Sequence, residues 1–257
     1  MTKRKIKKII KKHQKWLNGE WGGKCANFKK KNLKNIDFSN VDLSYADFSG
    51  AKLYGANFTG SKLTHTNFIL ASAKEADFSE ADLTFADFYG ANLQNAKFIN
   101  SCSKVVLFNF SDLFGADFTN ASLHGTKFTS SNLNAANMDN IKVNNNTKGL
   151  DLHCPAEGSF IGYKKASNYI VKLEIPKSAM RSSATSNACR CDRAKVLSIT
   201  KKNGKESKKN IVKSTYDPEF VYEIGKISRV KNFDENRWNE ATTGIHFYMT
   251  RQEAVDW

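Results

Sequence analysis

The sequence contains no long apolar run, and this absence argues against a chain that crosses a membrane as a helix. No segment approaches the ~18 consecutive apolar residues that such a helix needs. The basic N-terminus is not followed by the apolar core, about 7–15 residues long, of a secretory signal. Cysteine is scarce as well. The five cysteines are odd in number and lack the spacing of a disulfide framework, which predicts free thiols in the cytoplasm.

Charge is plentiful, but it is unevenly distributed. The 257 residues carry a net charge of +15, with 25% charged and 40% hydrophobic residues, which is typical of a globular protein. Residues 1–24 hold nine Lys or Arg and one Glu, residues 25–148 have a net charge of +1, and residues 149–257 hold 19 basic and 13 acidic residues. A polyanionic or acidic partner would therefore meet the ends of the chain rather than its middle.

A five-residue repeat fills the middle of the chain. From Phe28 to Val143 every fifth residue is large and apolar, except Ala73 and Ser103 among 24 positions. Two residues before each large one stands a residue that is usually small, and the residue between them is usually polar. A period of five fits neither the period of about 3.6 of an α-helix nor that of about 2 of a β-strand.

The alternation of large and small residues indicates a coiled, stacked chain. Residues two apart point to the same side of an extended segment, so both would face inward and the polar residue between them outward. The Gly, Ser and Asn residues that follow would turn the chain. A strip of this kind buries its apolar side only by stacking on itself.

This pattern resembles the pentapeptide-repeat family, whose members fold as a right-handed quadrilateral β-helix. The resemblance covers about residues 25–145 and implies four pentapeptides per coil, hence six coils for the 24 central positions. It also implies that central residues 20 apart stack along the axis. The two expected aromatic stacks are Phe28, Phe48, Phe68, Phe88, Phe108 and Phe128, and opposite them Phe38, Phe58, Phe78, Phe98, Phe118 and Met138.

The charge of the repeat region argues against one function known in this family. Members linked to quinolone resistance resemble duplex DNA in shape and negative charge. Residues 25–148 hold 12 Lys against 11 Asp and Glu, so the acidic surface that this mimicry needs is absent. We interpret the near-neutral solenoid as a spacer or docking surface.

Residues 1–24 are expected to form a basic helix that caps the first coil. Gly19 suits the C-terminal end of this helix. The apolar stripe would cover the open end of the solenoid, as repeat proteins require. The alternative is that its Lys face binds nucleic acid or an anionic membrane surface. The stripe consists of Ile6, Ile9, Ile10, His13 and Leu17.

Residues 149–257 are expected to form a small, strand-dominated α+β domain. Strands are predicted at 158–165, 169–175, 194–206, 220–227 and 244–250, and a capping box at Thr250–Glu253 opens a terminal helix. The segment resembles an uncharacterised domain that follows pentapeptide repeats in many phage and some bacterial proteins. That resemblance implies an architecture and a phage or bacterial source, but no chemistry.

Four polar clusters, at 181–185, 189–193, 233–238 and 244–251, stand where a packed core does not need them. They predict a binding site for a partner or ligand. At least two of Arg181, Arg237 and His246 should line a concavity beside 234–238 that binds an anionic group. The alternative is purely structural, with turns, a local ion pair and a buried Trp. The candidate residues are Arg181, Ser182, Ser183, Arg190, Asp234, Glu235, Arg237, Trp238, His246 and Arg251.

Catalytic and metal chemistry find weaker support. His153, Cys154, Cys189 and Cys191 contain enough ligands for zinc, but Cys-x-Cys is tighter than the usual spacing and no second pair exists, so no metal is predicted. No nucleophile-elbow motif accompanies the Ser and Cys residues. Residues 244–257 faintly resemble a strand and helix of the NAD-binding ADP-ribosyltransferases, but the further strands and catalytic Glu of that family are missing.

The sequence therefore predicts a non-enzymatic protein-interaction scaffold, in which a solenoid displays a C-terminal recognition domain to a protein partner. The partner would be a host factor if the source is a phage, and the location would then be the host-cell cytoplasm. One alternative is a nucleotide-binding or ADP-ribosyltransferase-like enzyme in the C-terminal domain. A second is a nucleic-acid binder that uses the basic N-terminus with residues 201–209. No cofactor is predicted, and the sequence names neither the partner nor the oligomeric state.

Overall fold

The computed structural model describes residues 1–151, 153–183 and 186–257. The chain divides into two compact units, Met1–Asp151 and Leu152–Trp257. Within the described residues, the helices are too short and too polar to cross a membrane.

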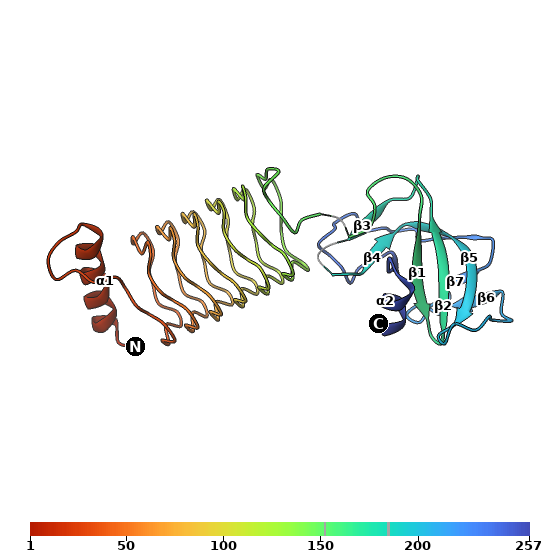
Figure 1. Ribbon diagram of the computed structural model, residues 1–257, viewed down its shortest axis with the longest axis horizontal. Coiled ribbons are helices and arrows are strands. Elements are labelled where there is room, and N and C mark those ends of the chain that lie inside the picture. Colours follow the sequence, from red (N-terminus) through yellow and green to blue (C-terminus); the bar gives the residue numbers. More distant parts are fainter. Residues whose placement is uncertain (152, 184–185) are drawn as a thin grey trace. The chain divides into compact units, whose positions relative to one another are not determined.

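The first unit is a β-helix-like solenoid whose coils are joined by parallel β-bridges (Figure 1). Except for the last, each bridge of this unit joins a residue to the one 20 positions later, as in Asp47↔Asn67 and Lys52↔Ser72. The bridging residue is the one before each central residue of the repeat and is usually polar. Backbone hydrogen bonds run between successive coils, for example from Phe48 N to Asn67 O (2.7 Å). The five-residue pattern thus places four bridged segments in every coil.

Each bridged segment ends in a turn whose last residue has a positive φ. These residues, which we call corner residues, occur at every fifth position from Lys30 to Asn140. In one such turn Tyr45 has φ 67° and Ala46 N donates to Leu43 O at 3.0 Å. Glycine and asparagine are favoured there because they tolerate the left-handed conformation.

The core of the solenoid is formed by the two expected phenylalanine stacks. Rings of successive coils lie face to face, as in Phe68 and Phe88, with centroids 4.6 Å apart and planes 3° apart. The stacks also meet across the axis, where Phe78 and Phe88 are edge to face at 5.4 Å and 86°. The phenylalanines of both stacks are fully buried, so each coil adds apolar surface to one continuous core.

The regular register ends at Val143, the last residue of the five-residue pattern, but this residue is not part of the buried core. Lys142 still bridges Ser122, whereas the next bridge joins Lys127 to Lys148, one residue more than the regular spacing. Val143 is 47% exposed, in contrast to the large residues of the preceding coils. The smaller residue Ser103 is buried in its layer, where its hydroxyl hydrogen-bonds to that of Ser101 at 2.9 Å.

Helix α1 (Lys3–Leu17) covers the first coil through two side chains. His13 Nδ1 accepts a hydrogen bond from Ala26 N at 3.1 Å, and Gln14 Nε2 donates to Asp42 O at 3.0 Å. Ile6 and His13 are buried, whereas the lysines of the helix other than Lys15 are exposed. Gly19 follows the helix with φ 68°. The helix therefore occupies backbone groups that a further coil would otherwise bind.

Because His13 accepts with Nδ1, the buried ring is neutral, and burial lowers its pKa below the ordinary value of 6.5. The undocked helix therefore binds more protons than the docked one at low pH. Its docking should be complete above about pH 6.5 and weaken as the pH falls toward the lowered pKa. We expect faster amide hydrogen exchange in residues 3–17 at pH 5 than at pH 7, after correction for intrinsic rates. Equal corrected rates would contradict this, and His13→Gln should remove the pH dependence.

The described part of the second unit contains three antiparallel sheets and a short helix. One sheet has the order β1-β2-β5-β8, one has the order β3-β4-β9, and β6 pairs with β7. The elements are β1 (Phe160–Ala166), β2 (Tyr169–Ile175), β3 (Arg181–Ser183), β4 (Cys189–Cys191), β5 (Arg193–Lys201), β6 (Ile211–Lys213), β7 (Val221–Glu223), β8 (Ile227–Arg229), β9 (Ile245–Phe247) and α2 (Arg251–Asp256).

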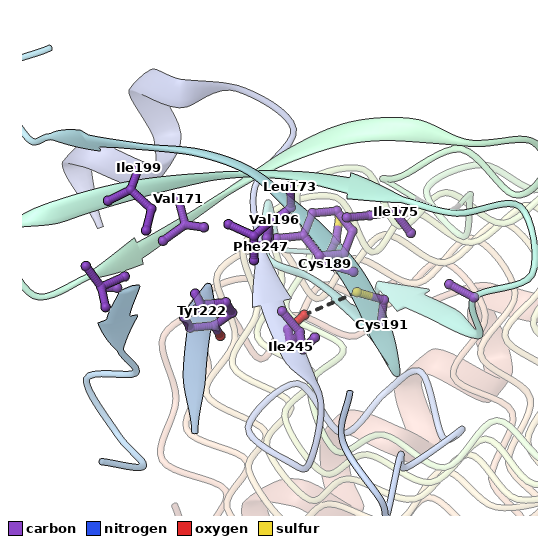
Figure 2. Packing of buried hydrophobic residues seen from close by; sticks show 14 of the residues in the cluster. Val171, Leu173, Ile175, Cys189, Cys191, Val196, Ile199, Tyr222, Ile245 and Phe247 are labelled. Atoms are coloured by element: carbon purple, nitrogen blue, oxygen red, sulfur yellow. Dashed lines mark hydrogen bonds between the residues drawn. The ribbon is translucent and has the colours of Figure 1, made fainter. Parts of the chain in front are cut away.

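The three sheets share one hydrophobic core (Figure 2). Leu173 and Val196 come from the largest sheet, Phe247 from the β3-β4-β9 sheet, and Tyr222 from the β6-β7 pair. Phe247 packs against Gly162, where an added Cβ would lie 2.5 Å from the ring. The side chains on the inner faces of these short strands therefore hold the unit together.

Two sequence predictions for this unit are wrong. Residues 220–227, expected as one strand, form β7 and β8, which are separated by a turn at Gly225 (φ 83°). Residues 181–183 and 189–191, expected outside the core, are short strands with mostly buried side chains. They looked exposed because they are polar, but their partners come from distant segments. Residues 184 and 185 of the first cluster lie outside the described residues.

Candidate functional site

The β3-β4-β9 sheet brings three of the predicted site residues into one row. Antiparallel pairing places Arg190 between Ser182 and His246. Successive side chains of a strand point to opposite faces, so these three share one face. The other face of this sheet carries the two cysteines of β4, which Figure 2 shows in the core.

Arg190 hydrogen-bonds to the β8–β9 loop (residues 230–244) and so connects the loop to this row. Its guanidinium donates to the carbonyls of Asp234 (3.1 Å), Thr243 (3.0 Å) and Asn236 (2.9 Å), and it lies over the Phe233 ring. Arg190 is 2% exposed. The charge is therefore buried but hydrogen-bonded, as a buried charge must be.

His246 and Ser182 complete the row without forming a catalytic pair. His246 Nε2 donates to the carbonyl of Glu240 at 2.8 Å, which again holds the loop. Burial lowers the pKa of His246, so its ring is neutral near pH 7. The buried Ser182 hydroxyl has no hydrogen-bond partner within the described residues. This histidine therefore orients the loop rather than activating the serine.

The loop itself carries four more of the predicted residues. Arg237 Nε donates to Ser183 O at 3.1 Å, and its guanidinium lies 4.5 Å from the centroid of the buried Trp238 ring. The Asp234 carboxylate accepts from Asn236 N at 2.9 Å, and this bond closes a turn and lowers the pKa of the carboxyl. Glu235 is exposed at this turn. The loop is thus folded by local contacts and is held from beneath by the sheet.

Arg181, Ser183 and Arg251 lie apart from this row. Arg181 is on the opposite face of β3, where it donates to the carbonyls of Gly158 (2.7 Å) and Pro176 (2.8 Å). The Ser183 hydroxyl accepts from His153 N at 2.7 Å. Arg251 donates to the carbonyls of Lys201 and Lys202, both at 3.0 Å. The four arginines among the candidate residues therefore donate to backbone carbonyls of this chain.

A pocket that the sequence did not indicate lies at another edge of the unit. It is open, has a volume of about 650 Å³, and includes His153, whose Nε2 lies 3.8 Å from Glu253 Oε1. Glu253 also closes the capping box of α2 with Thr250. The capping box was evident from sequence, but its proximity to residue 153 was not. The lining residues are His153, Cys154, Pro155, Ala156, Met249, Thr250 and Glu253.

Metal binding finds no support in this geometry. Among the described residues, no group of three or more His, Cys, Asp or Glu side chains could hold a metal ion. His153, Cys154, Cys189 and Cys191, weighed from sequence as a zinc set, do not form such a group.

The solenoid presents a second candidate surface, made by its corner residues. Most corner residues are Gly, Asn or another small or polar residue, but five are bulky and apolar. Corner residues 20 positions apart occupy equivalent places in successive coils, and we call each such set a column. The five bulky residues fall into two columns, one at each end of the same bridged segment. With Tyr89 from that segment they form what we call the apolar face. Its members are Tyr45, Leu70, Phe85, Tyr89, Val105 and Phe110.

The side chains of the apolar face pack on one another while remaining exposed. His65 stacks between Tyr45 and Phe85, with ring centroids 4.9 and 4.8 Å away. Tyr89 and Phe110 are 5.3 Å apart, and each is about half exposed, at 46% and 56%. A contiguous exposed patch of this kind is typical of an interaction surface.

The corner columns on the other sides differ in composition. They hold no bulky apolar residue and consist of Asn35, Gly55, Glu75, Asn95, Gly115 and Ala135, and of Asn40, Gly60, Glu80, Asn100, Asn120 and Asn140.

Comparisons with known proteins confirm the resemblance seen in the sequence. The model for pentapeptide repeats matches residues 24–60, 32–68, 61–100 and 108–145. The model described as a family of unknown function, DUF5758, matches residues 150–254. No curated protein matches the chain. The chain thus carries pentapeptide repeats followed by a separate DUF5758 domain.

Solved structures that match the chain are pentapeptide-repeat proteins of low similarity. QnrB1, a plasmid-mediated fluoroquinolone resistance protein, is 18% identical, with 47% of this chain and 90% of that chain covered and a TM-score of 0.28. Rfr23 from the cyanobacterium Cyanothece 51142 is 27% identical, with 48% and 86% covered and a TM-score of 0.18. HetL from Nostoc sp. strain PCC 7120, involved in heterocyst differentiation regulation, is 18% identical, with 53% and 92% covered and a TM-score of 0.17.

Proposed function

We propose that this protein is a non-enzymatic protein-interaction scaffold. In this proposal, residues 25–148 form a right-handed quadrilateral β-helix capped by residues 1–24, and residues 149–257 form a small α+β domain that the solenoid displays. The observation that carries the proposal is the apolar face, where bulky residues occupy backbone positions that favour Gly or Asn.

The backbone conformation of the apolar face makes its composition informative. Val105 has φ 55°, and Phe85 and Phe110 have φ 62° and 60°. A bulky residue in the left-handed region costs of order 1–3 kcal/mol, and a β-branched residue is an outlier there. Since these side chains are exposed, burial in the free protein does not offset the whole of that cost. Contact with a partner would offset this cost, because the same side chains would then leave water.

The chemistry of the partner follows from what borders the apolar face. Trp16 of α1 meets Tyr45 edge to face at 6.1 Å, so the helix continues this surface. We therefore propose a protein partner whose contact surface combines apolar and acidic side chains, since positive charge favours an acidic partner. The exposed basic residues of α1 are Lys3, Arg4, Lys5, Lys7, Lys8, Lys11 and Lys12.

The predicted polar site has a narrower role in this proposal. Arg190 and His246 fix the β8–β9 loop, which presents Glu235 and Arg237 at its turn. We propose that this turn is the recognition edge of the C-terminal domain, and that its shape depends on the buried row beneath it. Nucleotide binding and catalysis are not part of the proposal, because the guanidinium groups that would bind phosphate donate to backbone carbonyls.

Photo-crosslinking tests the proposal. Benzoylphenylalanine in place of Phe85 or Phe110 should crosslink one and the same protein in a lysate of the source cells, through a peptide rich in acidic and apolar residues. The same group in place of Glu80, a corner residue in another column, should not crosslink that protein. Equal crosslinking from position 80, or crosslinked peptides without acidic residues, would refute the proposed surface.

Replacing Val105 with Asn should stabilise the free protein. The substitution removes a β-branched residue from φ 55° and costs little burial, since Val105 is 39% exposed. We expect the free energy of unfolding to rise by about 1 kcal/mol. The matched control is Asn100→Val, at φ 58° in another column, which should lower it by a similar amount. Denaturant unfolding of the two variants measures both effects. A loss of stability in Val105→Asn would show that Val105 serves the fold rather than a partner.

A further inference from the structure

Three of the five cysteines meet in the core of the second unit. Cys154, Cys189 and Cys191 are 2%, 0% and 0% exposed. Cys189 and Cys191 are alternate residues of β4 and point to the same side of the strand. These thiols belong to one hydrophobic cluster, although the first lies far from the other two in the sequence.

The residues next to Cys154 and Cys189 are in contact. The preceding residue, His153, donates its N–H to the Ser183 hydroxyl at 2.7 Å. Ser183 is the cross-strand neighbour of Cys189 in the pairing of β3 with β4. Both residues belong to the same cluster of packed, buried side chains, and each thiol perturbs the pKa of the other. Neighbouring cysteines form a disulfide when their Cβ atoms approach to about 3.5–4.5 Å.

The two thiols differ in their access to solvent. Cys154 lines the open pocket, together with His153, Met249, Thr250 and Glu253, whereas Cys189 does not line it. A small molecule in the pocket would therefore reach Cys154 first. Cys189 and Cys191 are fully buried in β4, where Cys191 Sγ donates to Ile245 O at 3.9 Å (Figure 2).

The surroundings also make the two thiols chemically unequal. The neighbouring Cys189 thiol and the charge of Arg181 lower the pKa of Cys154 to about 7. The neighbouring Cys154 thiol and burial raise the pKa of Cys189. Thiolates, not thiols, attack disulfides, so Cys154 is the better nucleophile and Cys189 keeps its proton.

We infer that Cys154 and Cys189 form a redox site that reacts with low-molecular-weight disulfides such as oxidised glutathione and closes an internal disulfide. The Cys154 thiolate attacks one sulfur of oxidised glutathione, forms a mixed disulfide and releases one glutathione thiolate. Cys189 then gives up its proton to that thiolate or to water and attacks the Cys154 sulfur. The Cys154–Cys189 bond forms, and the second glutathione leaves as a thiolate. The two cysteines are oxidised together and one glutathione disulfide is reduced.

The test exposes the folded protein to oxidised glutathione, blocks the remaining thiols with N-ethylmaleimide, and maps disulfides by peptide mass spectrometry. Cys25 and Cys102, the solenoid cysteines, are first replaced with Ser so that only the second unit reacts. We expect a Cys154–Cys189 disulfide in this parent. Cys189→Ala should stop at the mixed disulfide of Cys154 with glutathione. Cys191→Ala, the matched control in the same strand, should still form the Cys154–Cys189 bond.

Two outcomes would overturn the inference. One is a parent in which Cys154 stays free and alkylatable at glutathione concentrations that oxidise an exposed thiol of a control protein. The other is glutathione bound first to Cys189 or Cys191. Circular dichroism before oxidation identifies any variant that has not folded. If a variant has not folded, the order in which products form in the parent tests the inference, because a mixed disulfide on Cys154 must appear before the Cys154–Cys189 disulfide.

The pH dependence gives a second readout in the same parent protein. Alkylation of Cys154 by iodoacetamide should reach half of its maximal rate near pH 7, rather than near the ordinary thiol value of 9.0. At pH 7 this corresponds to about a 50-fold larger thiolate fraction than in an ordinary thiol. A midpoint near pH 9 would remove Cys154 as the attacking group.

Discussion

Replacing Phe88 with Ala should lower the free energy of unfolding by about 3–5 kcal/mol. The ring lies between Phe68 at 4.6 Å and Phe108 at 5.2 Å, and it is fully buried. The surrounding coils cannot collapse into the cavity, because hydrogen bonds between coils fix their spacing, as from Phe88 N to Leu107 O at 2.8 Å. The loss should therefore include both the transfer of the ring and the cavity that it leaves.

The control for this prediction lies close by in the sequence. Phe85 has the same side chain but is 50% exposed and sits at a corner with φ 62°. Phe85→Ala should change the free energy of unfolding by less than about 1 kcal/mol. Denaturant unfolding followed by circular dichroism measures both variants. Similar losses in the two would mean that burial in the stack does not determine stability.

Replacing Arg190 with Ala should have the second large effect and lower the free energy of unfolding by about 3–5 kcal/mol. The substitution removes three hydrogen bonds from a buried charged group to the carbonyls of Asp234, Asn236 and Thr243, together with the contact of the guanidinium with the Phe233 ring. Hydrogen bonds to charged groups contribute about 1.5–3 kcal/mol each, and all three are lost together. We expect residues 230–244 to exchange amide hydrogens faster, while residues 25–148 keep their protection.

Arg190→Lys separates geometry from charge at this position. Lysine keeps the positive charge but offers one compact donor group instead of a planar fork, so it cannot reach all three carbonyls together. Arg190→Lys should therefore recover less than half of the free energy of unfolding that Arg190→Ala loses. If hydrogen exchange in residues 230–244 is unchanged in Arg190→Ala, the loop does not depend on this residue and the row is not its anchor.

The repeat region could be predicted from sequence because its contacts follow a fixed period. Phe68 meets Phe88 because the two hold the same position in successive coils, and every coil repeats that spacing. A short pattern that recurs along the chain therefore specifies the whole core. The pattern also indicates that the register ends at Val143, but not that this last residue is exposed.

The candidate site was predictable only as a set of residues, not as an arrangement. Arg190 contacts the carbonyls of residues far along the chain, and nothing in the local sequence specifies that the acceptors are backbone atoms. Arg181 was expected to line a binding site, yet it donates to the carbonyls of Gly158 and Pro176 and so connects these two segments. Polar residues in short strands look like a binding site until their partners are known.

The apolar face could not be predicted from the sequence for a different reason. Bulky residues at Tyr45, Phe85 and Val105 were visible, but the five-residue pattern assigns corner positions no role beyond turning the chain. Their alignment appears only when equivalent positions of successive coils are superimposed and their turns are seen to have positive φ. The cost of that conformation then separates these residues from ordinary exposed apolar side chains.

Hydroxyl-radical footprinting tests the central claim most directly, because exposed aromatic rings on two sides of the solenoid can be compared within one molecule. Phe85 and Phe110 belong to the apolar face, whereas Tyr54 and Phe114 are also exposed, at 39% and 42%, but lie on another side. In a lysate of the source cells, compared with buffer, oxidation of Phe85 and Phe110 should fall several-fold relative to that of Tyr54 and Phe114. Equal protection of the two pairs, or protection of Tyr54 and Phe114 alone, would contradict the account.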